Sequence, residues 1–521
     1  MFVTTRSPGI RPMHPYLVPL APALPKHPSF TMAEALLLAL GEELRTKRLG
    51  EEHASVERLV EERGREVQRL MFEGWCNERA ALEAGRDVTG ADGVVRTHHR
   101  QAGRELESVF GAVVVERDRV GARGTDALAP ADAALNLAAD RFTFGARQRV
   151  AVEAARGSFA AAAEAVGATT GANVVKRQAE ALVIAASVDF DMFYKESSRW
   201  QGEAPVPAST LLVLTVDGKG IVMRPEGLRA ATRKAAAKAT SKLKRRLSKG
   251  EKGNRKRMAT VGAVYFQEPT PRSPGDVLGE LDNTTPKPRA RPTRKRVFAS
   301  VKKTSRDVIG ELFDEAAQRD PQHQHRWVVL VDGNGPQIAD VEAAAVSEGV
   351  TVTLVLDLIH AIEYLWAAAW EFHQEGDPAA EEWVTKYLRM ILDGRASATA
   401  GAIRRSATAR KLEKRTSVDK AATYFLNKKA LMRYDEYLRD GLPIATGVIE
   451  GACRYLVKDR MDITGARWGL DGAEAVLRLR SLWASGDFDA YWPYHREREF
   501  ERNHLSKYAV DEDDWLLRRA A

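Results

Sequence analysis

Two aspartates occur in the same short motif, each directly after a run of apolar residues. Asp217 follows the run 211–216 and Asp332 follows the run 327–331, and a glycine comes next in both cases. Such runs are typical of buried strands, and aspartate at the carboxyl end of a central strand lies where α/β sheets bind their ligands. The glycine lets the backbone turn and lets a bulky substrate come close. Asp-Gly alone also makes a good turn, but two copies in this setting favour a functional site.

A third carboxylate lies in a helical pattern further along the chain. Glu450 belongs to the segment 447–456, where apolar residues recur at helical spacing. Carboxylate oxygens are the hard ligands that Mg²⁺ prefers, and Mg²⁺ keeps coordination positions for water and phosphate. Two such ions about 4 Å apart activate an attacking oxygen and stabilise a leaving one. Together, Asp217, Asp332 and Glu450 predict a centre for phosphodiester chemistry with two Mg²⁺ or Mn²⁺ ions.

A further acidic signal follows the apolar run 350–356. Asp357 comes directly after that run, and His360 lies at the start of the next helical pattern. Asp357 is explained equally well as an N-cap, which satisfies a free backbone N–H, and His360 as an ordinary surface or core histidine. The alternative is that the two side chains support the active site through a histidine–carboxylate hydrogen bond. Asp357 also competes with Asp332 for the place of the second catalytic aspartate.

The elements that must position these residues form a mixed α/β pattern. Strand-like runs occur at 211–216, 221–223, 260–266, 327–331 and 350–356. Three neighbouring strands followed by alternating helix and strand are typical of a mixed five-stranded sheet with helices on both faces. We therefore predict an α/β domain over 205–485 and a C-terminal tail over 486–521. The domain is expected to contain a basic insertion at 227–303 and an α-helical insertion at 375–440.

The region before this domain is predicted to be mainly helical. Residues 1–31 carry seven prolines and predict a disordered leader, and 32–104 show helical periodicity with dense charge. Residues 105–200 begin with a β-hairpin pattern and continue as short helices, the last of which opens with Lys176 and Arg177. This order suits a helix-turn-helix, whose second helix enters the major groove, and equally suits an ordinary helical bundle.

Five segments of the chain resemble the DDE transposases of bacterial insertion sequences. The chain is most similar to the ISKra family and more distantly to the Mutator-like group. The resemblance extends over most of residues 105–495 and rests on five segments: LTVDGKGIVMRPEGLR (214–229), RKRMATVGAVY (255–265), WVVLVDGNG (327–335), LVLDLIHAIEYLWAAAW (354–370) and GVIEGACRYLVKDRMDITGARWGLDGAEAVLRLRSL (447–482). The resemblance implies an RNase H-like fold for the α/β domain. It also implies a transposase that binds the ends of an insertion sequence and catalyses metal-dependent DNA cleavage and strand transfer.

Position by position, the resemblance implies that Asp217, Asp332 and Glu450 are the catalytic, metal-binding residues. Asp357 and His360 match the Cys/Asp-x-x-His signature that follows the second aspartate in related transposases. We therefore prefer Asp332 as the second catalytic aspartate, which leaves Asp357 to pair with His360. In distant relatives the hairpin carries cysteines that resemble a zinc ribbon. This chain has none there, so we predict no zinc.

Two basic runs predict contacts with DNA. Between Arg229 and Arg257 there are thirteen lysines and arginines and one acid, and the segment 286–303 contains no acid. Each cation that meets a phosphate releases counterions, so such runs bind DNA strongly and without sequence choice. A solubilising loop is the alternative. The residues predicted to contact DNA are Lys176, Arg177, Lys242, Lys244, Arg245, Arg246, Arg255, Lys256, Arg257, Arg294, Lys295, Arg296, Arg454, Lys458, Arg460 and Arg467.

The composition excludes several other classes of protein. The 521 residues carry a net charge of +8, and their two cysteines, Cys76 and Cys453, exclude a disulfide scaffold. No run of 18 apolar residues is present, so no membrane span or membrane partner is expected. The resemblance to transposases further implies a bacterial cytoplasmic, nucleoid-associated protein that binds double-stranded DNA, both transposon ends and target, as a homodimer or higher oligomer.

Two other functions are compatible with the same residues. One is an RNase H-like nuclease that cleaves DNA without strand transfer, which would give cut DNA and no joined product. The other is a domesticated DNA-binding protein with an inactive site. The acidic triad Asp217, Asp332 and Glu450 argues against the second alternative, because a protein that only binds DNA has no need of it.

Overall fold

The computed structural model describes residues 26–196, 204–238, 255–279, 290–445, 447–463 and 465–509. The chain divides into two compact units. The first comprises Met1–Ala146, Val166–Asn173 and Arg496–Ala521, and the second comprises Arg147–Ala165 and Val174–His495. Among the described helices, none combines the length and the apolar character that crossing a membrane requires.

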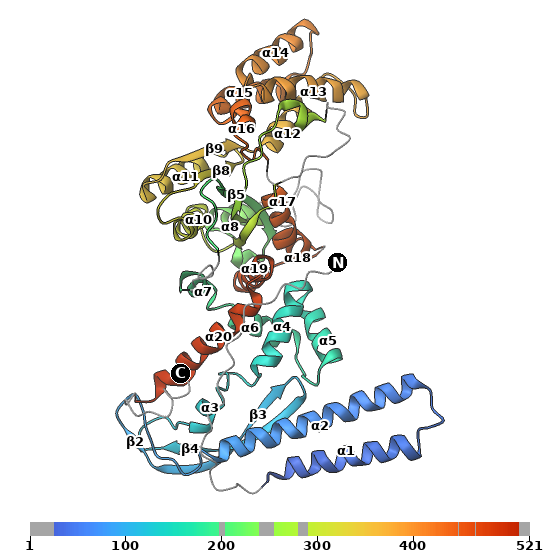
Figure 1. Ribbon diagram of the computed structural model, residues 1–521, viewed down its shortest axis with the longest axis vertical. Helices are drawn as coiled ribbons and strands as arrows, with labels where there is room; N and C mark the ends of the chain where they lie inside the picture. Colours follow the sequence, from blue (N-terminus) through green and yellow to red (C-terminus); the bar gives the residue numbers. More distant parts are fainter. Residues whose placement is uncertain are drawn as a thin grey trace. The chain divides into compact units, whose positions relative to one another are not determined.

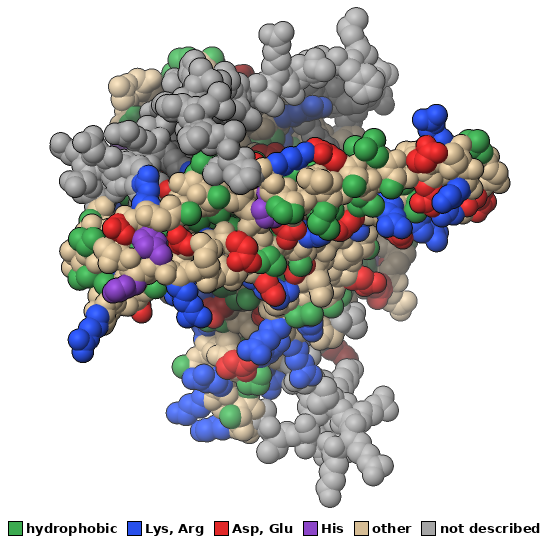
Figure 2. All heavy atoms as spheres, turned by 90° about the horizontal axis from the view of Figure 1, so that it is seen from below, with side chains coloured by type: hydrophobic (Ala, Val, Ile, Leu, Met, Phe, Trp, Pro, Cys, Tyr) green, Lys and Arg blue, Asp and Glu red, His purple; other side chains and the backbone are tan. Residues whose placement is uncertain are grey.

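The first unit combines a pair of long helices with a β-hairpin (Figure 1). Its elements are α1 (Pro28–Thr46), α2 (His53–Ala81), β1 (Val88–Thr89), β2 (Val95–Arg96), β3 (His98–Ser108), β4 (Gly111–Gly121) and α3 (Pro130–Ala134). α2 packs on β4, where the Asn77 amide donates to Val114 O and accepts from Glu116 N. In Figure 2 the arm formed by α1 and α2 extends to the right, and acidic and basic side chains are interspersed along it. Ion pairs such as Arg65–Glu61 account for that mixture.

Two boundaries predicted for this region differ from the structure. α1 begins at Pro28, so residues 28–31 belong to a helix rather than to a leader, and Ser29 donates to Glu73 of α2. Residues 1–25 lie outside the described part. The segment 32–104 is helical only as far as Ala81, because β1, β2 and most of β3 follow within it.

The second unit is built around a mixed five-stranded sheet with the order β7-β6-β5-β8-β9. The strands are β5 (Leu211–Val222), β6 (Lys256–Gln267), β7 (Thr293–Ser300), β8 (Arg326–Val331) and β9 (Val352–Leu356). β6 pairs antiparallel with β5 and β7, whereas β5, β8 and β9 run parallel. The helices of the sheet region are α8 (Ala230–Lys238), α9 (Pro274–Leu278), α10 (Ser305–Arg319), α11 (Gly335–Glu348), α12 (Leu358–Ala369), α17 (Gly447–Ala452), α18 (Asp459–Met461) and α19 (Leu470–Ser485). The chain is therefore a mixed α/β protein with a mainly helical N-terminal region.

The two faces of the sheet are covered by different helices (Figure 1). Gly262 of β6 faces Leu312 of α10, where a Cβ atom would lie 3.0 Å from the leucine. Val216, which pairs with Gly262, shares this face, so its neighbour Asp217 points to the opposite one. On that opposite face Cys453, which follows α17, reaches Asp217. The buried runs in β5 and β8 are typical of parallel strands covered on both sides.

The structure corrects the predicted end of the first strand. The runs 211–216 and 221–223 were predicted as two strands separated by a turn at Asp217-Gly218, but β5 continues from Leu211 to Val222. Gly218 and Gly220 stay in the ladder, opposite Thr260 and Met258 of β6. Asp217 therefore lies within a strand rather than at its end.

β7 comes from a segment that was predicted to be part of a basic insertion. β7 lies within 286–303 and forms the edge next to β6, so part of the predicted basic insertion belongs to the sheet itself. Arg296 of β7 is buried and bonds Glu315 of α10, which also pairs with Arg319 at 2.6 Å. Burial of a charged side chain is tolerated because an opposite charge and hydrogen bonds compensate the lost hydration.

The remaining helices flank the sheet region along the chain. They are α4 (Phe144–Arg156), α5 (Phe159–Thr169), α6 (Lys176–Ala186), α7 (Phe190–Glu196), α13 (Pro378–Leu392), α14 (Ala396–Ala409), α15 (Thr416–Lys428), α16 (Tyr434–Arg439) and α20 (Phe488–Asn503). α4, α5 and α6 lie where a helix-turn-helix was predicted, and α6 packs on α19. α13 to α16 fill the insertion predicted at 375–440. The predicted tail at 486–521 contains α20.

Removing the Arg296 side chain is predicted to destabilise the sheet. An Arg296→Ala substitution removes a buried cationic partner of Glu315, and breaking a buried pair in this way costs about 3 kcal/mol. Urea unfolding followed by tryptophan fluorescence measures this loss. Arg291→Ala is the matched control, because Arg291 lies close by and is exposed. Equal stability of the two variants would contradict the structural role given to Arg296.

Candidate active site

Three aspartates lie at one level across adjacent parallel strands. β5 pairs Thr215 with Leu330 of β8, so two residues further along both strands Asp217 and Asp332 are neighbours. β8 pairs Val331 with Leu356 of β9, so the next residues, Asp332 and Asp357, are neighbours as well. Adjacent strands are about 4.8 Å apart. The register of the sheet therefore places three carboxylates in one row.

Glu450 reaches the same region from α17, which packs against β5 and β6. Its side chain is exposed, whereas the preceding Ile449 is buried. Cys453 follows one helical turn after Glu450, and its thiol donates to Asp217 Oδ2 at 3.3 Å. Burial and the charge of Asp217 raise the pKa of the Cys453 thiol, so it stays protonated and keeps its proton for this bond.

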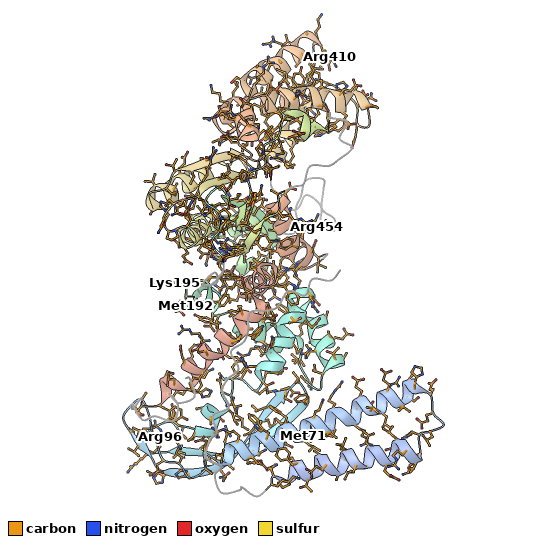
Figure 3. All side chains as sticks on the ribbon, viewed as in Figure 1. Met71, Arg96, Met192, Lys195, Arg410 and Arg454 are labelled. Carbon is orange, nitrogen blue, oxygen red and sulfur yellow. The ribbon has the colours of Figure 1, made fainter. Side chains whose placement is uncertain are left out.

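All the predicted acidic residues line one cavity of about 420 Å³. It lies at the edge of the sheet where β8 ends and β9 gives way to α12. Besides Asp217, Asp332, Asp357 and Glu450, its lining includes His360, Glu363, Lys219, Cys453, Arg454 and Lys458. Figure 3 labels Arg454, whose side chain is exposed. The cavity thus joins an acidic floor to cationic side chains.

Each aspartate is held by a local backbone N–H. Asp217 Oδ1 accepts from Gly218 N at 2.6 Å, and Asp332 Oδ1 accepts from Asn334 N at 2.7 Å. Asp357 Oδ1 accepts from Ile359 N at 2.9 Å, which makes Asp357 the N-cap of α12. Asp357 is 5% exposed, whereas Asp217 and Asp332 are half-buried. The N-cap interpretation of Asp357 is therefore confirmed, and the two other aspartates are more accessible.

The predicted pairing of Asp357 with His360 differs from the structure. His360 Nδ1 lies 3.1 Å from Glu363 Oε2, one turn further along α12. Residues three apart on a helix face each other, which explains why Glu363 takes this contact. The contact to Asp357 is made by the His360 backbone, whose N–H donates to Asp357 O at 3.2 Å.

A tyrosine from the helical insertion fixes the turn after β8. Tyr424 of α15 donates its hydroxyl to Asp332 O at 3.0 Å. Gly333 has a φ of 88°, and a Cβ atom there would lie 2.5 Å from the Tyr424 hydroxyl oxygen, so only glycine fits. Tyr424 stacks on Tyr364 of α12 with 4.0 Å between ring centroids. Burial raises the pKa of Tyr424, which keeps the hydroxyl a donor.

The donor chemistry of the cavity fits a hard divalent cation. Asp217, Asp332 and Glu450 offer carboxylate oxygens, which Mg²⁺ and Mn²⁺ prefer. Within the described residues, however, no three acidic, histidine or cysteine side chains stand close enough together to hold one ion as they are placed. Glu450 is exposed and Asp217 Oδ2 is engaged by the Cys453 thiol. A ligand set would therefore require these side chains to turn toward one another.

The structure separates the residues predicted to contact DNA into accessible and buried groups. Arg454, Lys458 and Arg467 are exposed, and the first two line the cavity. Arg467 lines a second pocket of about 260 Å³ with Arg233 and Arg255. Lys176 and Arg177 are exposed at the start of α6.

Other predicted cations have structural partners. Arg296 and Arg460 are buried, and Arg460 donates to Ala154 O, so neither is available to a phosphate. Arg257 donates to three backbone carbonyls, and burial lowers its pKa. Lys256 forms an ion pair with Asp462, and Arg294 donates a hydrogen bond to Ala204 O. Lys295 lies over the ring of Tyr455. Lys242, Lys244, Arg245 and Arg246 lie outside the described residues.

Three lining residues and one residue that bonds the Asp332 backbone were missed from the sequence. Lys219 lies two residues after Asp217 on β5 and so shares its face, a signal that strand periodicity could have provided. Cys453 and Glu363 each lie one helical turn after a predicted site residue and could have been found in the same way. Tyr424 is close to Asp332 only in the folded chain, and nothing in its own segment indicates a role.

A scan against models of known protein families finds no match for this chain, and a search of proteins with curated functions finds none either. The chemistry of the site therefore rests on its residues and on their geometry.

Loss of the Tyr424 hydroxyl is predicted to loosen the turn that carries Asp332. Tyr424→Phe keeps the ring and removes one hydrogen bond, which costs about 1 kcal/mol. We expect a small fall in thermal stability, together with a need for more Mg²⁺ to reach half-maximal thermal stabilisation by the ion. Tyr364→Phe is the control, because it retains the stacked ring without touching Asp332. An unchanged Mg²⁺ dependence in Tyr424→Phe would contradict a positioning role.

Proposed function

We propose that the chain is a DDE transposase that cleaves DNA at the ends of an insertion sequence and transfers the strands to a target. One observation carries this proposal: Asp217, Asp332 and Glu450, which are 115 or more residues apart, line one cavity with exposed cations at its rim. Carboxylates in a cleft with cations suit a metal-dependent reaction on a phosphodiester. The resemblance of five sequence segments to transposases of the ISKra family supports the same function.

The fold of the second unit is consistent with this function. We assign it to the RNase H-like class because its mixed five-stranded sheet carries acidic residues on two adjacent strands and is faced by the helix that carries Glu450. The mainly helical region before the sheet, with α4 to α6 and the exposed cations of α6, supplies a candidate DNA-binding element.

Asp217, Asp332 and Glu450 would hold two Mg²⁺ or Mn²⁺ ions, which, when bound, activate the attacking oxygen and stabilise the leaving one. We prefer Asp332 over Asp357 as the second carboxylate, because Asp357 is buried and caps α12. Lys219, Arg454 and Lys458 line the same cavity and would attract the phosphate group of the strand to be cut.

The reaction then proceeds as two in-line displacements at one site. Water attacks a phosphodiester at the end of the element, the P–O3′ bond breaks, and a free 3′-hydroxyl results. That hydroxyl attacks a target phosphodiester, and a new P–O bond replaces the one that breaks. The cations around the cavity hold each phosphate in turn, and no covalent enzyme intermediate is needed. Since two element ends must be joined to one target, a dimer or higher oligomer would act on double-stranded DNA, in the bacterial cytoplasm and at the nucleoid.

A nuclease without strand transfer is the second candidate, because the same cavity would support the first displacement alone. The two functions differ in their products. A nuclease gives cut DNA and no joined strand, whereas a transposase also gives a product in which element and target are covalently linked. Binding of DNA without either product would favour the third possibility, a DNA-binding protein with an inactive site.

Amide substitutions at the three carboxylates are predicted to slow cleavage and joining strongly. Asp217→Asn, Asp332→Asn and Glu450→Gln remove one charge each with little change in shape, and we expect rates to fall about 10²–10³-fold, the scale for losing one group that stabilises the transition state. The assay follows labelled DNA carrying element ends in Mg²⁺ or Mn²⁺. Glu342→Gln is the control, because Glu342 is exposed on α11 and does not line the cavity.

A parallel Asp357→Asn variant tests the choice of the second aspartate. Asparagine retains the N-cap, so the helix should persist while the charge is lost. Activity in this variant together with loss in Asp332→Asn supports the assignment. The reverse pattern contradicts it, and activity in all the carboxylate variants contradicts the proposed function.

A further inference from the structure

The first unit contains a pocket of about 560 Å³ that the proposed reaction does not use. It is bounded by the hairpin β3–β4, the loop that leads into α3, and the segment that follows α20 near the end of the described chain. Its charged lining residues are Arg96, Arg104, Arg117, Arg119, Lys507, Asp92, Asp126 and Asp132. Figure 3 labels Arg96. The five cations outnumber the three carboxylates, so the pocket has an excess of positive charge.

The pairing register of the hairpin gathers arginines on one of its faces. Arg100 is opposite Arg119, and Ala102 is opposite Arg117. Directly opposed residues of an antiparallel pair project from the same face, and so do residues two apart on one strand. Arg100, Arg104, Arg117 and Arg119 therefore share a face, although nothing in their linear order groups them. The pocket lies against this face.

Most of these cations already have partners that fix their positions. Asp132 accepts from Arg104 at 2.7 Å and from Arg117 at 2.5 Å, so one carboxylate serves two guanidinium groups. Arg96 pairs with Asp92 at 2.8 Å and donates to Asp126 O. Three arginines thus share two carboxylates, Asp92 and Asp132. This side of the pocket therefore keeps a net positive charge.

Two further cations remain available for a ligand. Arg119 on β4 and Lys507 beyond α20 line the pocket and are exposed, and neither has an ionic or hydrogen-bonding partner for its side chain among the described residues. The segment of Lys507 is tied to the first unit by backbone bonds. Ala91 N donates to Lys507 O at 2.9 Å, and Ala509 N donates to Thr89 O at 3.0 Å. The two free cations are thus held at the pocket from separate parts of the sequence.

We propose that this pocket is a phosphate-binding site that holds a backbone phosphate of bound DNA through Arg119 and Lys507. A guanidinium fork matches the oxygens of a phosphate, and an ammonium adds a point charge beside it. The arginine face extends past the pocket to the exposed Arg100. An extended cationic face suits a polyanion better than a small free anion, because further phosphates can contact it. The choice of DNA rests on the proposed function.

The test compares two double variants of the full chain. Arg119→Ala with Lys507→Ala removes the two free cations of the pocket. Lys47→Ala with Arg58→Ala is the matched control, because both residues are exposed, belong to the first unit and do not line the pocket. Binding of a labelled 30-base-pair duplex is measured by fluorescence anisotropy in EDTA at several salt concentrations, so that cleavage plays no part.

Loss of two phosphate contacts reduces the dependence of log affinity on log salt by about 1.8. Between 50 and 200 mM salt the wild type should therefore lose about 12-fold more affinity than the pocket variant. The control should keep the wild-type slope. If the pocket variant also keeps it, the assignment to backbone phosphate is wrong.

A second arm distinguishes DNA from a free phosphoanion. Inorganic phosphate and pyrophosphate are titrated into wild type and pocket variant, and thermal stability is recorded. Saturable stabilisation of wild type alone at millimolar anion, with an unchanged DNA slope, would overturn the DNA assignment in favour of a free anion. Because both arms measure binding without divalent metal, a reduced slope would stand even if no cleavage is found. Conversely, the pocket variant could keep the wild-type salt dependence of DNA affinity while the protein cleaves DNA. That result would leave the proposed function intact and overturn only the assignment of the pocket as a phosphate-binding site.

Discussion

The parallel register of β5, β8 and β9 is the constraint on which the candidate active site depends. Because Thr215 pairs with Leu330 and Val331 pairs with Leu356, three aspartates separated by up to 140 residues reach one level of the sheet. A shift of one residue in the β5–β8 or β8–β9 ladder would turn the side chains of the shifted strand to the other face of the sheet. The three aspartates would then no longer lie side by side. The apolar side chains of these strands, buried on both faces, hold that register. Packing energy in the sheet therefore sets the geometry of the polar site above it.

Around that row, each neighbouring element serves both packing and the site. α17 presents Glu450 on its exposed side and is followed by Cys453, whose thiol meets Asp217. α15 supplies the Tyr424 hydroxyl that holds the turn after β8, and Gly333 leaves room for it. The helical insertion is thus connected directly to the backbone of Asp332.

The sequence predicted those parts of the fold that depend on local patterns. The apolar runs of β5, β8 and β9 identified buried strands, and helical periodicity identified α1, α2 and the helix of Glu450. The predicted end of the first strand was wrong. Asp217-Gly218 is a sequence that favours a turn, but pairing with β6 keeps these two residues extended. β7 was missed because its arginines resemble a flexible basic run, and only the fold shows that Glu315 neutralises Arg296. The strand register and the contact between Tyr424 and Asp332 arise only in the folded chain. They therefore could not be predicted from local sequence patterns.

The most direct test of a single centre formed by Asp217, Asp332 and Glu450 is affinity cleavage with Fe²⁺ in place of Mg²⁺. Iron held at the cavity, with ascorbate and peroxide, generates hydroxyl radicals that cut the backbone close by. A shared centre predicts breaks beside all three residues in one sample, suppressed by excess Mg²⁺ and lost together in Asp332→Asn. Breaks beside one of them alone, or breaks that excess Mg²⁺ does not suppress, would contradict a common metal site.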